Sequence, residues 1–201
     1  SRTDSKADHV QRFIAHKFPN LRPRRILDMG CSAGSASVPY ALAFPESEVH
    51  AIDVGSGMLR YAHARAESLG AAVHFHQMDC AATRFDDESF DLIVSHNMMH
   101  EISGATRRGM LRESRRLLRP GGLCVHQDVP LRFKGLSEFK KFEMSWDTLH
   151  NNEPFWEVYA NGDLEPELRA AGFDADCIHV GSLEAAQGSL PWFVACGWRK
   201  P

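Results

Sequence analysis

The first stretch of this sequence that could bind a ligand is Asp28-Met-Gly-Cys-Ser-Ala-Gly34, which ends a short apolar run. Its two glycines allow a sharp turn and a close approach of the backbone to a bound molecule. The spacing differs from the G-x-G-x-x-G of dinucleotide-binding folds, and no Lys-Ser/Thr pair follows to hold a phosphate. A carboxylate beside the turn favours a cationic ligand over an anionic one.

Three further stretches add carboxylate and imidazole groups. They are Asp53, Gln77-Met-Asp-Cys80 and Ser95-His-Asn-Met-Met-His-Glu101. Asp53 follows the glycine turn by about twenty residues, where nucleotide-binding α/β folds place a carboxylate that accepts hydrogen bonds from both ribose hydroxyls. A helix cap is the alternative for an isolated aspartate. Taken with the glycine turn, the position of Asp53 favours ribose binding.

The elements that must position these groups alternate between strand and helix, which predicts an α/β domain with a mostly parallel sheet. We expect strands over residues 25–29, 48–54, 72–77, 90–95 and 123–127, and a closing hairpin over 177–180 and 190–198. We expect helices over residues 8–18, 35–44, 56–69, 104–118 and 163–171, and a turn at 120–122. All four chemical stretches then follow strands, as do His126, Gln127 and Asp128. Because ligands of parallel sheets lie beyond the carboxyl ends of the strands, one shared site is expected there.

The alternation loosens over residues 130–162, where aromatic residues are frequent. This segment is interpreted either as a helical piece that covers the edge of the sheet or as a lid or wall of an acceptor pocket. We expect a single domain over residues 1–201, with 130–162 as a helical, aromatic insertion or lid. The chain opens at Ser1 rather than Met, so we also expect a tag or a further segment upstream.

Composition restricts the class of protein. The 23 Lys and Arg residues against 26 Asp and Glu residues give a net charge of −3, which disfavours nucleic acid as a partner. No apolar run is long enough to span a bilayer, and no secretory signal opens the chain. The five cysteines form no C-x-x-C pair, so neither a zinc site nor a disulfide framework is indicated. Reduced thiols in a cytoplasmic protein are expected.

Residues 25–128 resemble the class I S-adenosylmethionine-dependent methyltransferases. The motifs that carry the resemblance are Leu27-Asp-Met-Gly-Cys-Ser-Ala-Gly34, His50-Ala-Ile-Asp53, Met78-Asp-Cys80, Phe90-Asp-Leu-Ile-Val-Ser95 and Leu118-Arg-Pro-Gly-Gly-Leu123. A weaker resemblance to a poorly characterised subgroup continues over residues 153–156 and 163–173. The resemblance implies a Rossmann-like, doubly wound seven-stranded sheet, mostly parallel with an antiparallel last strand and with helices on both faces.

The resemblance also implies how S-adenosyl-L-methionine is bound. Asp28, Gly30 and Gly34 would surround its methionine part, and Asp53 would hold the ribose. The third glycine that the family usually has in the first loop is Ser32 or Ser35 here, a mild departure.

By the same resemblance, Met58 would pack against the adenine. Asp79 would accept a hydrogen bond from the adenine amino group, with the Cys80 backbone beside it. Ser95 and His96 would lie near the sulfonium and its methyl group.

His96 and His100 are the candidate general bases, because imidazole accepts protons near neutral pH and the two residues lie four positions apart. The pattern H-x-x-x-H-E differs from the H-E-x-x-H of zinc proteases, and the sequence indicates no third ligand. We therefore predict no metal site. For each histidine, the alternative is a purely structural role.

The expected function is methyl transfer from S-adenosylmethionine to a small-molecule acceptor by in-line displacement, with S-adenosylhomocysteine as the product. Two alternatives stay open, a catalytically silent cofactor-binding partner subunit and a methyltransferase that acts on protein or RNA. An arsenite methyltransferase would need its cysteines clustered at one site, which their spacing does not favour. The acceptor, its reacting atom and the oligomeric state are not determined by the sequence.

Overall fold

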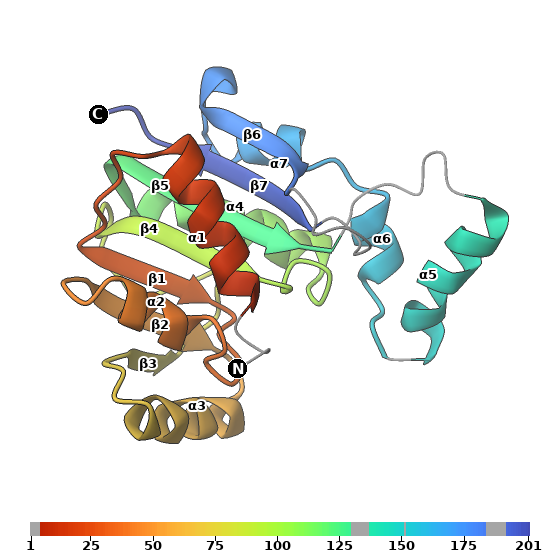
Figure 1. Cartoon of the computed structure of the whole chain (residues 1–201). Helices are drawn as coiled ribbons and strands as arrows, with labels where there is room; N and C mark the ends of the chain where they lie inside the picture. Colours follow the sequence, from red (N-terminus) through yellow and green to blue (C-terminus); the bar gives the residue numbers. More distant parts are fainter. Residues whose placement is uncertain (1–4, 130–136, 151, 184–191) are drawn as a thin grey trace.

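The computed structural model describes residues 5–129, 137–150, 152–183 and 192–201, and these residues build one seven-stranded sheet (Figure 1). The strand order is β3-β2-β1-β4-β5-β7-β6. Strands β1 to β5 run parallel, and β7 is antiparallel to both β5 and β6. The strands are β1 (Arg25–Met29), β2 (Glu48–Asp53), β3 (His74–Gln77), β4 (Phe90–His96), β5 (Leu118–Asp128), β6 (Ile178–Ser182) and β7 (Phe193–Trp198). The predicted fold class is confirmed, and the strand order reverses between β1 and β4.

The helices are α1 (Ser5–Lys17), α2 (Ser37–Ala43), α3 (Ser56–Ser68), α4 (Gly104–Leu117), α5 (Glu138–His150), α6 (Trp156–Ala160) and α7 (Leu164–Ala170). Helices cover both faces of the sheet, whereas α5 stands apart from it and packs against α6 (Figure 1). None of the helices in the described part of the chain has the length and hydrophobicity that a membrane span requires. Residues 190 and 191 of the predicted hairpin, and 130–136 and 151 of the predicted insertion, lie outside the described residues.

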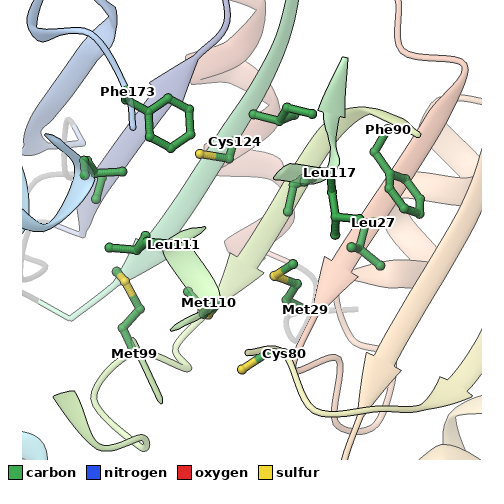
Figure 2. Packing of buried hydrophobic residues seen from close by; sticks show 14 of the residues in the cluster. Leu27, Met29, Cys80, Phe90, Met99, Met110, Leu111, Leu117, Cys124 and Phe173 are labelled. Carbon is green, nitrogen blue, oxygen red and sulfur yellow. The ribbon is translucent and has the colours of Figure 1, made fainter. Parts of the chain in front are cut away.

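Strand residues of opposite parity pack on opposite faces, because successive side chains of a strand alternate. Leu27 and Met29 of β1 pack with Met110 of α4 in one buried cluster (Figure 2). Ile26 belongs to a second cluster, in which it is buried with Tyr40 of α2 and with residues of α1. The two clusters fix the sheet between helix layers.

The turn expected at residues 120–122 is wrong, because these residues belong to β5. Phe90 pairs with Leu118, whereas Leu92 pairs with Leu123, so extra residues of β5 bulge from the ladder. The bulge is held by Arg199, whose carbonyl accepts from the Gly121 N–H and whose N–H donates to the Gly122 carbonyl. Gly121 has a φ of 81°, which a glycine adopts without strain.

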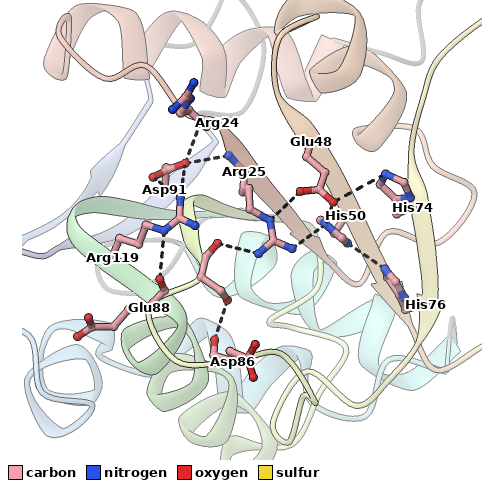
Figure 3. A network of polar contacts seen from close by, with 11 residues as sticks. Arg24, Arg25, Glu48, His50, His74, His76, Asp86, Glu88, Asp91 and Arg119 are labelled. Carbon is pink, nitrogen blue, oxygen red and sulfur yellow. Dashed lines mark hydrogen bonds and ion pairs between the residues drawn. The ribbon is translucent and has the colours of Figure 1, made fainter.

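A network of charges joins the amino ends of the strands (Figure 3). The Asp91 carboxylate of β4 accepts from the backbone N–H groups of Arg24 and Arg25 at 2.8 Å. The Arg25 guanidinium in turn lies 2.9 Å from the Glu48 carboxylate of β2. Burial, together with the Arg25 charge, lowers the pKa of His50 in this network to about 4. These charges occupy the end of the sheet that lies away from the predicted site.

Candidate functional site

The loop after β1 is tied to the end of β2. The N–H groups of Gly30 and Cys31 donate to the Ile52 carbonyl at 2.8 and 3.0 Å. Gly30 has a φ of 71°, and a β-carbon added there would lie 2.4 Å from the Met98 sulfur. The positive φ favours glycine at this position, and the Met98 side chain would have to shift to make room for any larger residue.

Asp53 ends β2, and its carboxylate is fixed by backbone donors from two loops. The Ser32 N–H donates to Oδ2 and the Gly55 N–H donates to Oδ1, both at 2.8 Å. A carboxylate accepts about four hydrogen bonds, so its oxygens keep capacity for further donors. The loop after β1 and the start of α3 thus hold the Asp53 carboxylate in one position.

A cavity of about 530 Å³ lies among the loops that follow β1, β2, β3 and β4. Five of the predicted residues line it, namely Gly30, Asp53, Asp79, Cys80 and His96. A second cavity of about 540 Å³ lies at the other end of the strands and is lined by none of the predicted residues. The two cavities have similar volumes, so their lining residues decide between them. The cavity at the carboxyl ends of the strands is the candidate site.

Five predicted residues do not line this cavity, namely Asp28, Gly34, Met58, Ser95 and His100. Asp28 is buried, accepts a 2.6 Å hydrogen bond from the Ser37 hydroxyl, and so ties β1 to α2. Burial raises its pKa to about 7. A β-carbon on Gly34 would lie 3.2 Å from Ala62 of α3, so this glycine serves helix packing. Contact of the first four residues with a cofactor, and the role of His100 as a base, stay predictions.

Ser95 is engaged in a buried chain of hydrogen bonds. Its hydroxyl lies 2.9 Å from His126 Nδ1, and His126 Nε2 lies 3.2 Å from the Ser114 hydroxyl. Ser114 donates its own proton to the Met110 carbonyl, so it accepts from Nε2, and Ser95 donates to Nδ1. Burial lowers the pKa of His126 to about 3, which keeps this imidazole neutral. These hydrogen bonds link β4 to β5 and to α4.

His96 is held from two sides at the edge of the cavity. Gln127 donates from Nε2 to the Asp128 carbonyl at 3.4 Å and to Asn97 Oδ1 at 3.2 Å, so its Oε1 faces His96. That oxygen lies 3.1 Å from His96 Nδ1, which assigns the ring proton to Nδ1. Nε2 then carries the lone pair and accepts from the Tyr40 hydroxyl at 3.3 Å. In this tautomer, Nε2 is the nitrogen of His96 that can accept a proton.

His100 is turned to Asp128 instead of the cavity. Its Nδ1 lies 2.5 Å from Asp128 Oδ1, and the Met99 N–H donates to Oδ2 of the same carboxylate at 2.6 Å. His100 is only 5% exposed, and its ring packs edge-on against Trp156 with 4.9 Å between centroids. Burial opposes the charged imidazole, but the hydrogen bond and charge of Asp128 outweigh it and raise the pKa of His100.

Sequence reasoning missed Tyr40, the side chain that contacts His96 Nε2. Tyr40 lies on α2, far along the chain from β4, and its ring is completely buried. The only signal in the sequence is a phenol on the apolar face of a helix, since a buried tyrosine hydroxyl usually finds a partner.

The comparisons with known proteins agree with this geometry. Residues 26–122 match the family model described as methyltransferase domain. A malonyl-[acyl-carrier protein] O-methyltransferase of Methylococcus capsulatus is 32% identical over 154 residues, which cover 75% of this chain and 52% of that protein. The chain therefore spans about half the length of this relative.

Residues 26–122 carry a methyltransferase domain, and the fold is that of the class I S-adenosylmethionine-dependent methyltransferases. A solved S-adenosylmethionine-dependent methyltransferase of Aquifex aeolicus has the same fold, with a TM-score of 0.65 and 23% identity over 95% of this chain and 88% of that one. A phosphoethanolamine N-methyltransferase 2 of Haemonchus contortus, solved with S-adenosyl-L-methionine, superposes with a TM-score of 0.71 at 18% identity, covering 96% of this chain and 53% of that one. The predicted family, with its enzyme class and cofactor, is confirmed.

Proposed function

We propose that this methyltransferase transfers the methyl group of S-adenosylmethionine to a small-molecule acceptor by in-line displacement. The observation that carries the proposal is Asp53, held by the Ser32 and Gly55 N–H groups at the wall of the candidate cavity. A carboxylate at the end of the second strand is suited to accept both ribose hydroxyls. The positions of Asp79 and Cys80 on the same cavity support a place for the adenine beside them.

The residues around the cavity fit this cofactor. Gly30 lines the cavity with backbone atoms only, because it has no side chain. This supports binding of the methionine part of the cofactor next to Gly30. Asp79 uses Oδ1 to accept from the Ala81 N–H at 2.8 Å, and an adenine amino group would bind at its other oxygen. Burial raises the pKa of the Cys80 thiol to about 12, so this thiol stays neutral and acts by packing rather than as a nucleophile.

When bound, S-adenosylmethionine supplies a methyl group that is already electrophilic, so the chain has to align the acceptor and exclude water. His96 is the general base for an acceptor hydroxyl. As the new C–O bond forms and the C–S bond breaks, the hydroxyl proton would pass to His96 Nε2, which for this step would exchange the hydrogen bond from Tyr40 for one from the acceptor. An amine or thiolate acceptor would not need this proton transfer before attack.

The acceptor class is inferred from charge and from relatives. A net charge of −3 supports a small molecule over RNA. The Haemonchus contortus structure is named for phosphoethanolamine, whereas the Methylococcus capsulatus relative is named for a malonyl group on acyl-carrier protein. A protein-borne acceptor is therefore the second candidate. The five thiols are buried and free, which supports the cytoplasmic location expected from composition.

Calorimetric titration with S-adenosylhomocysteine tests the assignment of the cofactor site. Replacing Asp53 by alanine removes two charge-assisted hydrogen bonds, each worth about 1.5–3 kcal/mol, so affinity is expected to fall at least tenfold. Asp86→Ala is the matched control, because this exposed aspartate lies before β4 at the other end of the sheet. Equal affinity of the two variants would refute the role of Asp53. A wild-type protein that binds the cofactor but never methylates any acceptor would favour the silent partner subunit.

A further inference from the structure

We propose that His100, Glu101 and Glu153 bind a divalent transition-metal cation beside the cofactor cavity. One ligand atom from each of the three side chains lies within 4.8 Å of the others. His100 Nε2 is 3.4 Å from Glu101 Oε1, a separation close to the roughly 3.4 Å between ligand atoms of a tetrahedral ion with bonds of about 2.1 Å. Glu153 reaches this place from the segment before α6.

The imidazole is oriented as metal-binding histidines usually are. Its Nδ1 is held by Asp128, and a carboxylate at one ring nitrogen fixes the tautomer and leaves the other nitrogen to coordinate. Asp128 is itself rigid, because the Met99 and Val129 N–H groups donate to its two oxygens at 2.6 and 2.7 Å. His100 Nε2 is therefore presented to Glu101 without need of rearrangement.

The charges around His100 favour a cation. The Asp128 carboxylate lies 2.5 Å from Nδ1, Glu101 lies 3.4 Å from Nε2, and Glu153 reaches the same place. The three carboxylates carry a charge of −3 together, and His100 and Asp128 are both buried. A divalent ion would compensate most of this charge.

Trp156 provides an independent observation. It is 8% exposed, its ring packs against His100, and its indole N–H has no hydrogen-bond partner in the part of the chain that the structure describes. Buried donors are normally satisfied. A water molecule bound to the metal would provide an acceptor beside this ring.

The ligand set indicates the kind of metal. One imidazole nitrogen and two carboxylate oxygens suit Zn²⁺, whereas Mg²⁺ and Ca²⁺ prefer oxygen alone. Glu101 also lines the cofactor cavity, so a bound ion would lie next to the candidate site. A second acidic group, Asp174, Asp176 and Cys177, is mostly exposed, and Lys200 lies 2.8 Å from Asp176, so it makes a poor competitor.

The test is calorimetric titration of the metal-free full chain with Zn²⁺, without S-adenosylmethionine. We expect one site whose affinity falls at least tenfold in Glu153→Gln and roughly 10- to 100-fold in Asp128→Asn. Glu157→Gln on α6 is the matched control and should bind like wild type, since Glu157 is exposed and outside the cluster. The chain has eleven histidines, and others among them could also bind zinc. The site is therefore identified by the difference in affinity between the variants and not by the number of zinc ions bound.

Absence of zinc binding by wild type, or equal affinity in Glu153→Gln and Glu157→Gln, would overturn the proposal. A further expected result is weaker binding as the pH falls, because the His100 proton competes with the metal. Titration with S-adenosylhomocysteine is measured separately. Failure of the zinc site therefore leaves the proposed methyl transfer intact, and failure of cofactor binding leaves the zinc site intact.

Discussion

Two histidines four residues apart have different surroundings, and this difference divides their roles. His96 lines the cavity and offers Nε2, while Gln127 holds Nδ1. His100 is buried against Asp128. At the scale of single residues, we therefore propose His96 rather than His100 as the general base, and the His100 imidazole belongs to a charge cluster beside the site.

We expect His96→Ala to lower the turnover of a hydroxyl acceptor by about 100-fold or more, because loss of a base typically costs 100- to 10,000-fold. Affinity for S-adenosylhomocysteine should stay nearly unchanged, and the rate should lose most of its pH dependence between roughly pH 6 and 8. Initial rates across this pH range provide the measurement. His63→Ala on α3 is the control, since His63 is exposed and does not line the cavity. Near-normal turnover in His96→Ala would show that the reaction needs no base there.

Among the elements, α4 and the loop after β3 approach each other closely at a glycine. A β-carbon on Gly109 would lie 2.6 Å from the Ala81 β-carbon, in the loop that also carries Asp79 and Cys80. Gly57, near the start of α3, has open space at the same point, with only the end of the Arg60 side chain at 4.0 Å. Packing therefore requires a glycine at position 109 of α4 but not at position 57 of α3.

Alanine at these two glycines should therefore have opposite effects. Gly57→Ala is expected to leave the free energy of unfolding unchanged or to raise it by up to ~1 kcal/mol, because alanine loses less entropy in a helix. Gly109→Ala gains the same helix propensity, but the added β-carbon forces α4 away from Ala81. Overpacking of this kind lowers the free energy of unfolding by about 1–3 kcal/mol. Urea unfolding at neutral pH measures both. Equal stabilisation by the two substitutions would show that α4 lies farther from the loop after β3.

Taken as a whole, the molecule has one element that stands apart from the sheet. Helix α5 packs against α6, away from the sheet (Figure 1). Its exposed aromatic side chains include Phe139, Phe142 and Trp146. Through α6 this helix connects to Trp156 and so to His100. We propose that residues 1–201 form a single domain and that segment 130–162 provides the acceptor wall.

If α5 forms that wall, the double variant Phe139→Ser/Phe142→Ser should raise the KM for the acceptor several-fold. The free energy of unfolding should change by less than about 0.5 kcal/mol, because both rings are more than half exposed. Leu42→Ser on α2 is the control, since Leu42 is similarly exposed on another helix. An unchanged KM would argue against the wall. A change in sedimentation coefficient with unchanged KM would instead assign the aromatic face to self-association.

The sequence by itself determined the edge of the sheet at which the site forms. Gly30 and Asp79 follow strands, Asp53 ends one, and all three line the cavity. Strand ends follow from local signals, namely an apolar run and the turn residues after it. Because parallel strands end at the same edge, the approximate place of the site was predictable without knowledge of any contact.

The tertiary structure decided which way each side chain at that edge faces. Pairing of β4 with β5 sets Ser95 opposite His126 and His96 opposite Gln127, and the next turn brings His100 to Asp128. Packing of α6 onto this edge supplies Glu153, the third ligand that the sequence did not indicate. These partners lie far apart along the chain, and their meeting depends on strand register and helix packing. Local spacing carries no information on such long-range contacts, because a shift of one residue in register turns every side chain to the other face.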